Sequence, residues 1–346
     1  MPINLVNLFK QKTKKGDAMG QLSFADMVIK TTRKKSRITV KLDAINRIVN
    51  WNDVLSLVKV VDLTDRKTGG APHIDLLVKV KMLFLQYLYN LSDPELEDQV
   101  NDRLSFQSFI GLDLSTTVPD YTTIWRFRER LIENKLNDRL FELILGYLES
   151  QNLLIKKGTI IDATIIDSAN RPLSDKKREE LKQKQSSQID TDADSTMKRN
   201  KYYFGYKGHI GTDMGSKLIR KREFSSAKSH DSQYKDSLLS GDEEALFGDS
   251  AYSNIGDKRH YRKEGIYYGI LDKGTRRKQL SKKQKANNKK KSKIRSAVEH
   301  PFGYMKERLN YRKAVAKTQE RNRFRFDMNC IIYNIFRANY LLERMA

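Results

Sequence analysis

Thr159-Ile-Ile-Asp-Ala-Thr-Ile165 predicts a β-strand, because five of its seven residues are β-branched. Asp162 interrupts it with a group that is a poor strand former and costly to bury unpaired. A second apolar run, Ala245-Leu-Phe-Gly248, is followed directly by Asp249. Ligand sites of α/β sheets lie beyond the carboxyl ends of strands, so the two acids are predicted to meet at one edge of a sheet. Taken singly, Asp162 could cap a turn and Asp249 could begin a helix.

A third carboxylate comes from the segment Arg295-Ser-Ala-Val-Glu-His-Pro-Phe-Gly-Tyr-Met-Lys306. On a continuous α-helix, at about 100° per residue, Arg295, Glu299 and Lys306 share one face. A solvated helix with ordinary ion pairs would show the same spacing. With Asp162 and Asp249, however, Glu299 completes three hard oxygen donors without a histidine or cysteine cluster. Such a set favours Mg²⁺, with Mn²⁺ able to replace it.

The region around these acids predicts a mixed α/β sheet flanked by helices. Helices are expected at residues 232–239 and 252–264, between strands. The remaining expected strands lie at residues 203–211, 218–224, 245–248 and 265–271, the first two joined by a hairpin turn at 213–216. Residues 171–200 are polar and charged with no apolar face, so they are predicted to form a flexible insertion.

The preceding residues, 42–151, show helical periodicity and predict an all-α, helix-turn-helix-like domain. Ser92 and Glu95 form a capping-box pattern, and further helices are expected at residues 121–133 and 136–150. The helix at 121–133 is the expected recognition helix, with Arg126 and Arg130 facing a DNA groove; alternatively it only packs against its neighbours. Trp125 on this helix is expected in the core rather than as a base-stacking wedge. Residues 1–41 are basic and predict a leader or arm, and residues 152–346 form the expected catalytic domain.

The charge of the chain points to a polyanionic partner, because 66 Lys and Arg oppose 43 Asp and Glu, for a net charge of +23. Residues 273–295 contain 12 Lys or Arg and no acid, and predict a loop along the DNA backbone. Its expected DNA contacts are Lys289, Lys290, Lys291 and Lys293. No apolar run reaches about 18 residues, so no membrane-spanning helix is expected. The single cysteine and the absence of a secretion signal favour a reducing cytoplasm.

Several motifs together resemble one family. They are Gly158-Thr-Ile-Ile-Asp-Ala-Thr-Ile-Ile-Asp-Ser168, Phe204-Gly-Tyr-Lys-Gly-His-Ile-Gly211, Ser229-His-Asp231, Gly248-Asp-Ser-Ala-Tyr252 and Arg295-Ser-Ala-Val-Glu-His-Pro-Phe302. In this order they resemble the DDE transposases of the bacterial insertion-sequence-five family. Gln21-Leu-Ser-Phe-Ala-Asp26, Tyr89-Asn-Leu-Ser-Asp93 and Val118-Pro-Asp-Tyr-Thr-Thr-Ile124 extend the resemblance upstream.

The resemblance implies an RNase H-like catalytic domain with Asp162, Asp249 and Glu299 as its metal-binding triad. Arg295 and Lys306 match the family pattern Tyr-x2-Arg-x3-Glu-x6-Lys and would bind phosphate, whereas Ser292 stands where the pattern has tyrosine.

The expected function is therefore that of a magnesium-dependent DNA transposase in the nucleoid of a bacterial cytoplasm. It would bind double-stranded DNA at terminal inverted repeats, cleave the element ends, and join the 3′ hydroxyls to target DNA. Two ends must meet in one complex, so a homodimer on DNA is expected. Two alternatives stay open: a catalytically inactive repressor, and a metal-dependent nuclease without strand transfer.

Overall fold

A computed structural model describes residues 36–62, 74–112, 116–183, 189–198, 200–254, 256–275 and 279–345. Most of the predicted basic leader, and the upstream motif at residues 21–26, lie outside these described residues. The predicted leader, residues 1–41, overlaps the first described helix, which begins at Arg37. Ser36 caps this helix by accepting a hydrogen bond from the amide of Thr39.

The N-terminal region is helical, as predicted. Ser92 and Glu95 form both hydrogen bonds of the predicted capping box. The predicted helices at residues 121–133 and 136–150 are present with those bounds. The helices are α2 (Arg37–Ile48), α3 (Trp51–Val58), η2 (Lys59–Val61), α4 (Leu76–Tyr89), α5 (Asp93–Asp102), α6 (Leu104–Ile110), α7 (Tyr121–Glu133) and α8 (Leu136–Ser150).

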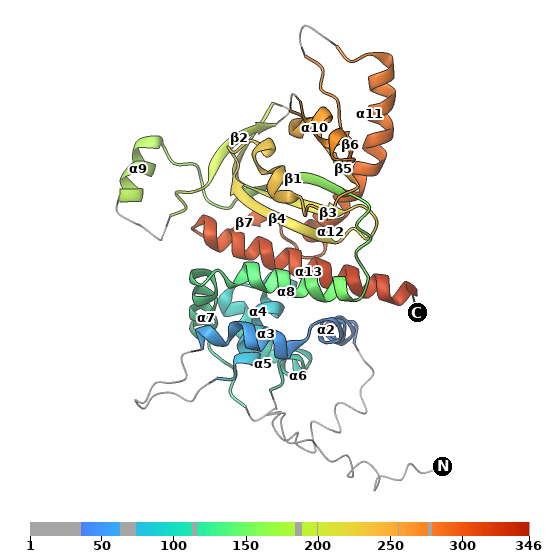
Figure 1. Cartoon of the computed structure of the whole chain (residues 1–346). Helices are drawn as coiled ribbons and strands as arrows, with labels where there is room; N and C mark the ends of the chain where they lie inside the picture. The colour runs from blue at the N-terminus through green and yellow to red at the C-terminus, as the bar shows by residue number, and fades with distance from the viewer. Residues whose placement is uncertain are drawn as a thin grey trace.

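One long C-terminal helix, α13 (Gln319–Met345), joins this helical region to the sheet. It packs against α2, α4 and α8 on one side and against β4 (Ile219–Ser226) on the other. Figure 1 shows α13 lying between the helical region and the sheet. The apolar core is consequently continuous across the boundary expected after residue 151. Among the described helices, none is long and apolar enough to span a membrane.

The sheet is mixed and centred on β1, which pairs antiparallel with β3 and parallel with β5. Its order is β2-β3-β1-β5-β6, with β4 also paired to β3 and β7 to β1. Antiparallel strands on one side of β1 and parallel strands on the other, with helices on both faces, give an RNase H-like α/β fold. The remaining strands are β1 (Thr159–Ser168), β2 (Asp194–Lys198), β3 (Lys201–Asp213), β5 (Ala245–Gly248), β6 (Tyr267–Ile270) and β7 (Lys313–Ala314).

Both faces of the sheet are covered, which explains the nearly continuous apolar runs in β1 and β5. Ile160 belongs to the core shared with α13 and the helical region, whereas Ile161 belongs to a second core on the opposite face. That second core is covered by η3 (Asp231–Tyr234), η4 (Asp236–Leu238), η5 (Ser250–Tyr252) and α10 (Asp257–Lys263). The helix predicted at residues 232–239 is therefore replaced by the two 3₁₀ turns η3 and η4, whereas the one predicted at 252–264 is present as the shorter α-helix α10.

The predicted flexible insertion at residues 171–200 is wrong in part, because it contains α9 (Asp175–Gln183) and the strand β2. A strand at the edge of a sheet needs backbone partners rather than an apolar face, and β2 obtains them from β3. Asp190 is buried, accepts a hydrogen bond from the hydroxyl of Tyr206 at 2.6 Å, and anchors the segment.

The predicted basic loop at residues 273–295 is also wrong over most of its length. Residues Lys282–Arg295 form the helix α11, followed by the 3₁₀ turn η6 (Ser296–Val298) and by α12 (Glu299–Glu307). Ser281 and Gln284 form a capping box, and lysine is a good helix former. Asn288 fastens α11 to the end of β6 through two hydrogen bonds with Asp272, each 3.0 Å long.

Candidate metal centre and nucleic-acid interface

Asp162 and Asp249 lie side by side at the candidate site. In the parallel pair β1–β5, Ile161 lies opposite Gly248, and each acid is the next residue of its strand or of the turn that follows it. The predicted meeting of these two acids is confirmed. One oxygen of each carboxylate accepts a backbone hydrogen bond, from Ala163 at 2.8 Å and from Ser250 at 2.6 Å.

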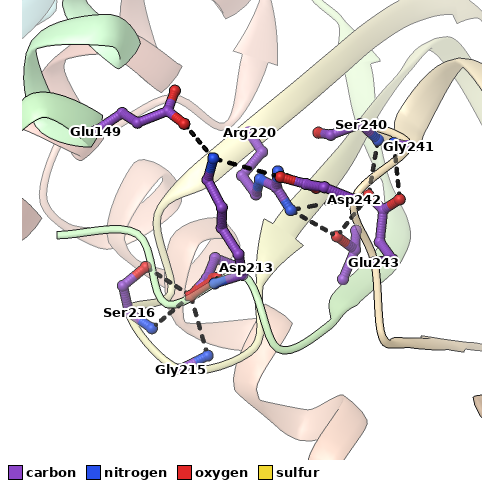
Figure 2. A network of polar contacts seen from close by, with 11 residues as sticks. Glu149, Asp213, Gly215, Ser216, Arg220, Ser240, Gly241, Asp242 and Glu243 are labelled. Carbon is purple, nitrogen blue, oxygen red and sulfur yellow. Dashed lines mark hydrogen bonds and ion pairs between the residues drawn. The ribbon is translucent and has the colours of Figure 1, made fainter. Parts of the chain in front are cut away.

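A polar network at the other end of these strands fixes β1 against β5 (Figure 2). The buried carboxylate of Glu243 accepts hydrogen bonds from the amides of Ser240 and Gly241 at 2.7 and 2.8 Å. The hydroxyl of Thr159, the first residue of β1, donates to it at 3.0 Å, and Arg220 lies 3.8 Å away. Glu243 thus ties β1 to the loop that leads into β5, which keeps the two catalytic candidates in register.

Arg295 supplies the cation that accompanies the acid pair. Its guanidinium donates to Asp162 at 2.6 Å, and both side chains are mostly buried. Burial raises the pKa of Asp162 above its ordinary value, and the charge of Asp249 adds to the rise. The amide of Ala163 and the cations Arg295 and Lys198 act in the opposite direction. The negative charge of Asp249 and the positive charges of Arg295 and Lys198 therefore act in opposite directions on the ionisation of Asp162.

Lys306, on α12, reaches the same strand two residues further along. Its ammonium group donates to the hydroxyl of Thr164 at 2.6 Å. Burial lowers the pKa of Lys306, as do the charges of Lys198 and Arg312, while Asp167 raises it. Arg295 and Lys306 thus both contact β1 near the acid pair, and their binding of phosphate stays a prediction.

The structure does not bring Glu299 to the other two acids. Within the described residues, no three His, Cys, Asp or Glu side chains are close enough together to hold one metal ion. The shared face of Arg295, Glu299 and Lys306 assumed a continuous helix, but η6 interrupts it and leaves Glu299 exposed as the first residue of α12. Pro301 fits this break, since it lies in the first turn of α12, where its missing N–H costs no hydrogen bond.

The Asp162–Asp249 pair nevertheless suits a hard divalent cation. Both groups are carboxylates, they lie on adjacent strand ends, and each has a second oxygen that no backbone amide holds. Oxygen donors of this kind bind Mg²⁺ or Mn²⁺ in preference to softer metals. The donor set therefore fits the predicted ion, and two of the three predicted acids lie on neighbouring strand ends.

Tyr252 is a residue of the site whose place the sequence did not reveal. Its side chain is fully buried, and its hydroxyl has no hydrogen-bond partner among the residues described. Burial raises the pKa of Tyr252 strongly, and so do the charges of Asp231, Asp162 and Asp249. This phenol is therefore a spare donor within the electrostatic reach of the acid pair. Its signal in the sequence was its position in the motif that contains Asp249.

His209 is structural rather than part of the acid site. It is fully buried, stacks on Tyr234 with 4.3 Å between ring centres, and lies 2.8 Å from the hydroxyl of Ser225. Burial and the charge of Lys207 lower the pKa of His209 to about 4, against the opposing charge of Asp231.

The basic helix α11 presents three of its four predicted DNA contacts to solvent: Lys289, Lys290 and Lys293 are exposed. The prediction for Lys291 is wrong. Its ammonium group is buried and donates to the carbonyl of Ile270 at 2.7 Å, so it fastens the helix to β6. Burial lowers the pKa of Lys291 accordingly.

The predicted recognition helix α7 buries Ile124, Phe127 and Leu131. Arg126 is exposed and Arg130 is half-buried. Trp125 is 40% exposed, so its expected place in the core is wrong.

Comparisons with known proteins assign the class. Residues 155–335 match a family model described as "Transposase DDE domain", and residues 30–130 match one described as "Transposase domain (DUF772)". The first match covers more than half of the chain, which therefore belongs to the DDE transposases.

One solved structure is also similar, the cryo-EM structure of a piggyBac transposase synaptic complex with hairpin DNA. The similarity covers 89% of this chain and 76% of that chain, with a TM-score of 0.46 and 10% sequence identity. At this distance the match adds nothing to the assignment.

Proposed function

We propose that this DDE transposase belongs to the insertion-sequence-five family and moves a DNA element by cleaving its ends and joining them to a target. The observation that carries the proposal is the pair Asp162 and Asp249 on adjacent strand ends, with Arg295 bound to one of them at 2.6 Å. A half-buried carboxylate pair with a neighbouring guanidinium suits the metal-assisted cleavage of a phosphodiester, because the acids can hold the metal and the guanidinium can bind phosphate.

In this proposal Asp162 and Asp249 would hold Mg²⁺, and Glu299 would complete the set after a rearrangement that brings the first turn of α12 toward them. When bound, Mg²⁺ would supply Lewis acidity at the phosphodiester. Arg295 has a fork of donors that matches a phosphate, and Lys306 offers a compact point charge beside Thr164. Both cations are held by β1, so they would orient the phosphodiester over the acids.

The remaining proposed contacts bind DNA away from the chemistry. Lys289, Lys290 and Lys293 project from α11 and would neutralise backbone phosphates. Arg126 and Arg130 of α7 would contact the terminal inverted repeat, as part of the helical region at residues 42–151. Two such ends must be held together, so the active form is proposed to be a homodimer on DNA.

A labelled duplex carrying the inverted repeat that flanks this reading frame tests the proposal. The intact protein should nick it only with Mg²⁺ or Mn²⁺ and join the 3′ end to a second duplex. Asp249→Ala should abolish both reactions while leaving duplex binding in place. Asp236→Ala is the matched control, because the side chain of Asp236 is 87% exposed and lies outside the site, and it should act as the wild type does.

Two other results would each refute the proposal and identify a different function. Binding of the inverted repeat without any nicking would identify a repressor that has lost catalysis. Hydrolysed ends that never appear joined to the second duplex would identify a metal-dependent nuclease without strand transfer.

A further inference from the structure

A cavity of about 250 Å³ begins on β1 one residue beyond Asp162 and has no role in the proposed chemistry. It lies between β1, the strand β2 and the segment 228–231. Three lysines and one acid line it, namely Lys198, Lys207, Lys228 and Asp231, and the side chains of Thr196 and Ser229 add hydroxyl groups. The lining therefore suits an anion with several oxygens.

Two of the three lysines have no acidic partner. Asp231 lies 2.9 Å from the ammonium group of Lys207, which also donates to the carbonyl of Ser229 at 2.7 Å, so this acid and this lysine neutralise each other. Lys198 and Lys228 are exposed, and neither forms an ion pair with another residue in the described ranges. The cavity consequently keeps one uncompensated positive charge on β2 and another on the segment 228–231.

The β2–β3 hairpin carries a further cation on the face that lines the cavity. Thr196 and Lys198 are alternate residues of β2, so they lie on one face of the hairpin, and both line the cavity. Lys201 of β3 lies directly opposite Lys198, so its side chain is on the same face. The ammonium group of Lys201 lies 5.3 Å from the ring centre of Tyr203, and no acid of the described residues pairs with it. Like charges directly opposite each other destabilise a hairpin, and an anion bound beside them would remove that cost.

The cavity adjoins the acid pair. Burial raises the pKa of Asp162 and lowers that of Lys306, and the charge of Lys198 lowers both. Lys306 donates to the hydroxyl of Thr164, which also lines the cavity. Successive phosphates of one DNA strand lie about 3.4 Å apart along the duplex axis. A strand whose cleaved phosphodiester lies over the acids would therefore bring a neighbouring phosphate within reach of the cavity.

We propose that this cavity binds one backbone phosphate of duplex DNA close to the cleaved bond, between Lys198 of the β2–β3 hairpin and Lys228. The hydroxyl groups of Thr196 and Ser229 are the uncharged donors beside it. The contact reaches no base, so it positions DNA of any sequence. The inference rests on the proposed function and adds to it that β2, which lies within the segment 171–200, is part of the DNA-binding surface.

The test measures binding of the full chain to a labelled inverted-repeat duplex by fluorescence anisotropy at several salt concentrations, without divalent metal. The double variant Lys198→Gln, Lys228→Gln should reduce the log–log salt slope by about 0.9, the contribution of one phosphate contact on duplex DNA. Its affinity for a duplex of scrambled sequence should fall by the same factor, because a phosphate contact carries no sequence information. Lys157→Gln is the matched control, since Lys157 is exposed before β1 and does not line the cavity, and it should leave the slope unchanged.

Two further measurements locate the contact and separate it from a structural role. Duplexes in which one phosphate at a time is replaced by an uncharged methylphosphonate are compared between the wild type and the double variant. At one position within a helical turn of the cleaved bond, the replacement should weaken binding of the wild type and leave that of the double variant unchanged. Thermal melting of Lys198→Gln alone should occur at or above the wild-type temperature, since the change removes one of two opposed like charges.

Three outcomes overturn the proposal: an unchanged salt slope in the double variant, equal losses in wild type and double variant at every methylphosphonate position, or a lower melting temperature of Lys198→Gln. The last would mean that the lysine holds the hairpin rather than DNA. If the intact protein nicks and joins inverted-repeat DNA while one of these outcomes is found, only the phosphate contact is refuted. If it neither nicks nor joins that DNA, the proposed function fails whatever the salt slopes are.

Discussion

Replacing Glu243 with alanine should destabilise the fold more than replacing any exposed residue of the same polar network. Its carboxylate is the common acceptor for the amides of Ser240 and Gly241 and for the hydroxyl of Thr159 (Figure 2). Arg220, which is also buried, lies 3.8 Å from it. Alanine leaves the two amides and the Thr159 hydroxyl without this acceptor at the point where β1 meets the loop before β5, whereas Arg220 keeps its ion pair with Asp242.

The magnitude follows from burial. A buried donor left unsatisfied costs about 1–3 kcal/mol, but such losses are not additive within one network. Removing one partner of a buried ion pair costs about 3–5 kcal/mol, and because Arg220 keeps Asp242 as a partner, we expect Glu243→Ala to lie at the lower end, about 3 kcal/mol. Glu243→Gln keeps one oxygen acceptor and should cost about half as much. With a urea slope of about 3 kcal/mol per molar, the alanine variant should unfold about 1 M earlier.

Urea unfolding followed by circular dichroism measures the loss, and Glu149→Ala provides the control. Glu149 belongs to the same network through its ion pair with Lys156, but both side chains are 40% or more exposed. Its removal should cost less than about 1 kcal/mol. Hydrogen exchange at Ile160 and Ile161 should rise in Glu243→Ala alone, since these residues form the ladder with β5. Equal losses for the two variants would refute the reasoning.

Three further predictions follow from buried contacts. Because the pKa of His209 falls from 6.5 to about 4 on folding, the unfolded state takes up the proton first, and stability present above pH 6.5 is lost as pH drops toward 4. Wild type should lose up to about 3 kcal/mol more than His209→Gln in urea titrations over that range. Gly208→Ala places a methyl group 2.4 Å from the ring of Phe326, so it should cost about 1–3 kcal/mol and lower the melting temperature. Lys291→Gln should lower stability by about 1–3 kcal/mol without changing the salt dependence of DNA binding, whereas Lys290→Gln should reduce that salt slope by about 1 and leave stability unchanged. Identical pH profiles, an unchanged melting temperature, or equal salt slopes would contradict the corresponding contact.

Elements governed by local signals could be predicted from the sequence. The bounds of α7 and α8 follow from apolar periodicity, and α5 follows from its capping box. The hairpin between β3 and β4 follows from Asp213, whose carboxylate accepts hydrogen bonds from the amides of Gly215 and Ser216 (Figure 2). Strand β2 has no apolar signal in the sequence because its order comes from pairing with β3, and α11 forms despite charge repulsion because lysine is a good helix former and Ser281 begins a capping box.

Some residues of the candidate site could likewise be placed from the sequence, and others could not. Asp162 and Asp249 could be placed because each follows an apolar strand, and parallel pairing brings strand ends together. Lys291 could not, because its neighbours in sequence are equally basic and only the docking of α11 on β6 decides which lysine is buried. Trp125 is the reverse case, a large aromatic side chain that tertiary packing leaves on the surface.

The predicted position of Glu299 is wrong because it assumed a continuous helix from Arg295 to Lys306. The contacts of Arg295 and Lys306 limit how this segment can rearrange. Arg295 is fastened to Asp162 and Lys306 to Thr164, so the segment between them is tethered at both ends to one short stretch of β1. Moving α11 or α12 as a whole would break one of these contacts and, for α11, also the buried hydrogen bond of Lys291. A rearrangement that adds Glu299 to the acid pair while keeping both tethers must therefore occur within the 3₁₀ turn η6 and the first turn of α12, where Pro301 already lacks a backbone hydrogen bond to lose.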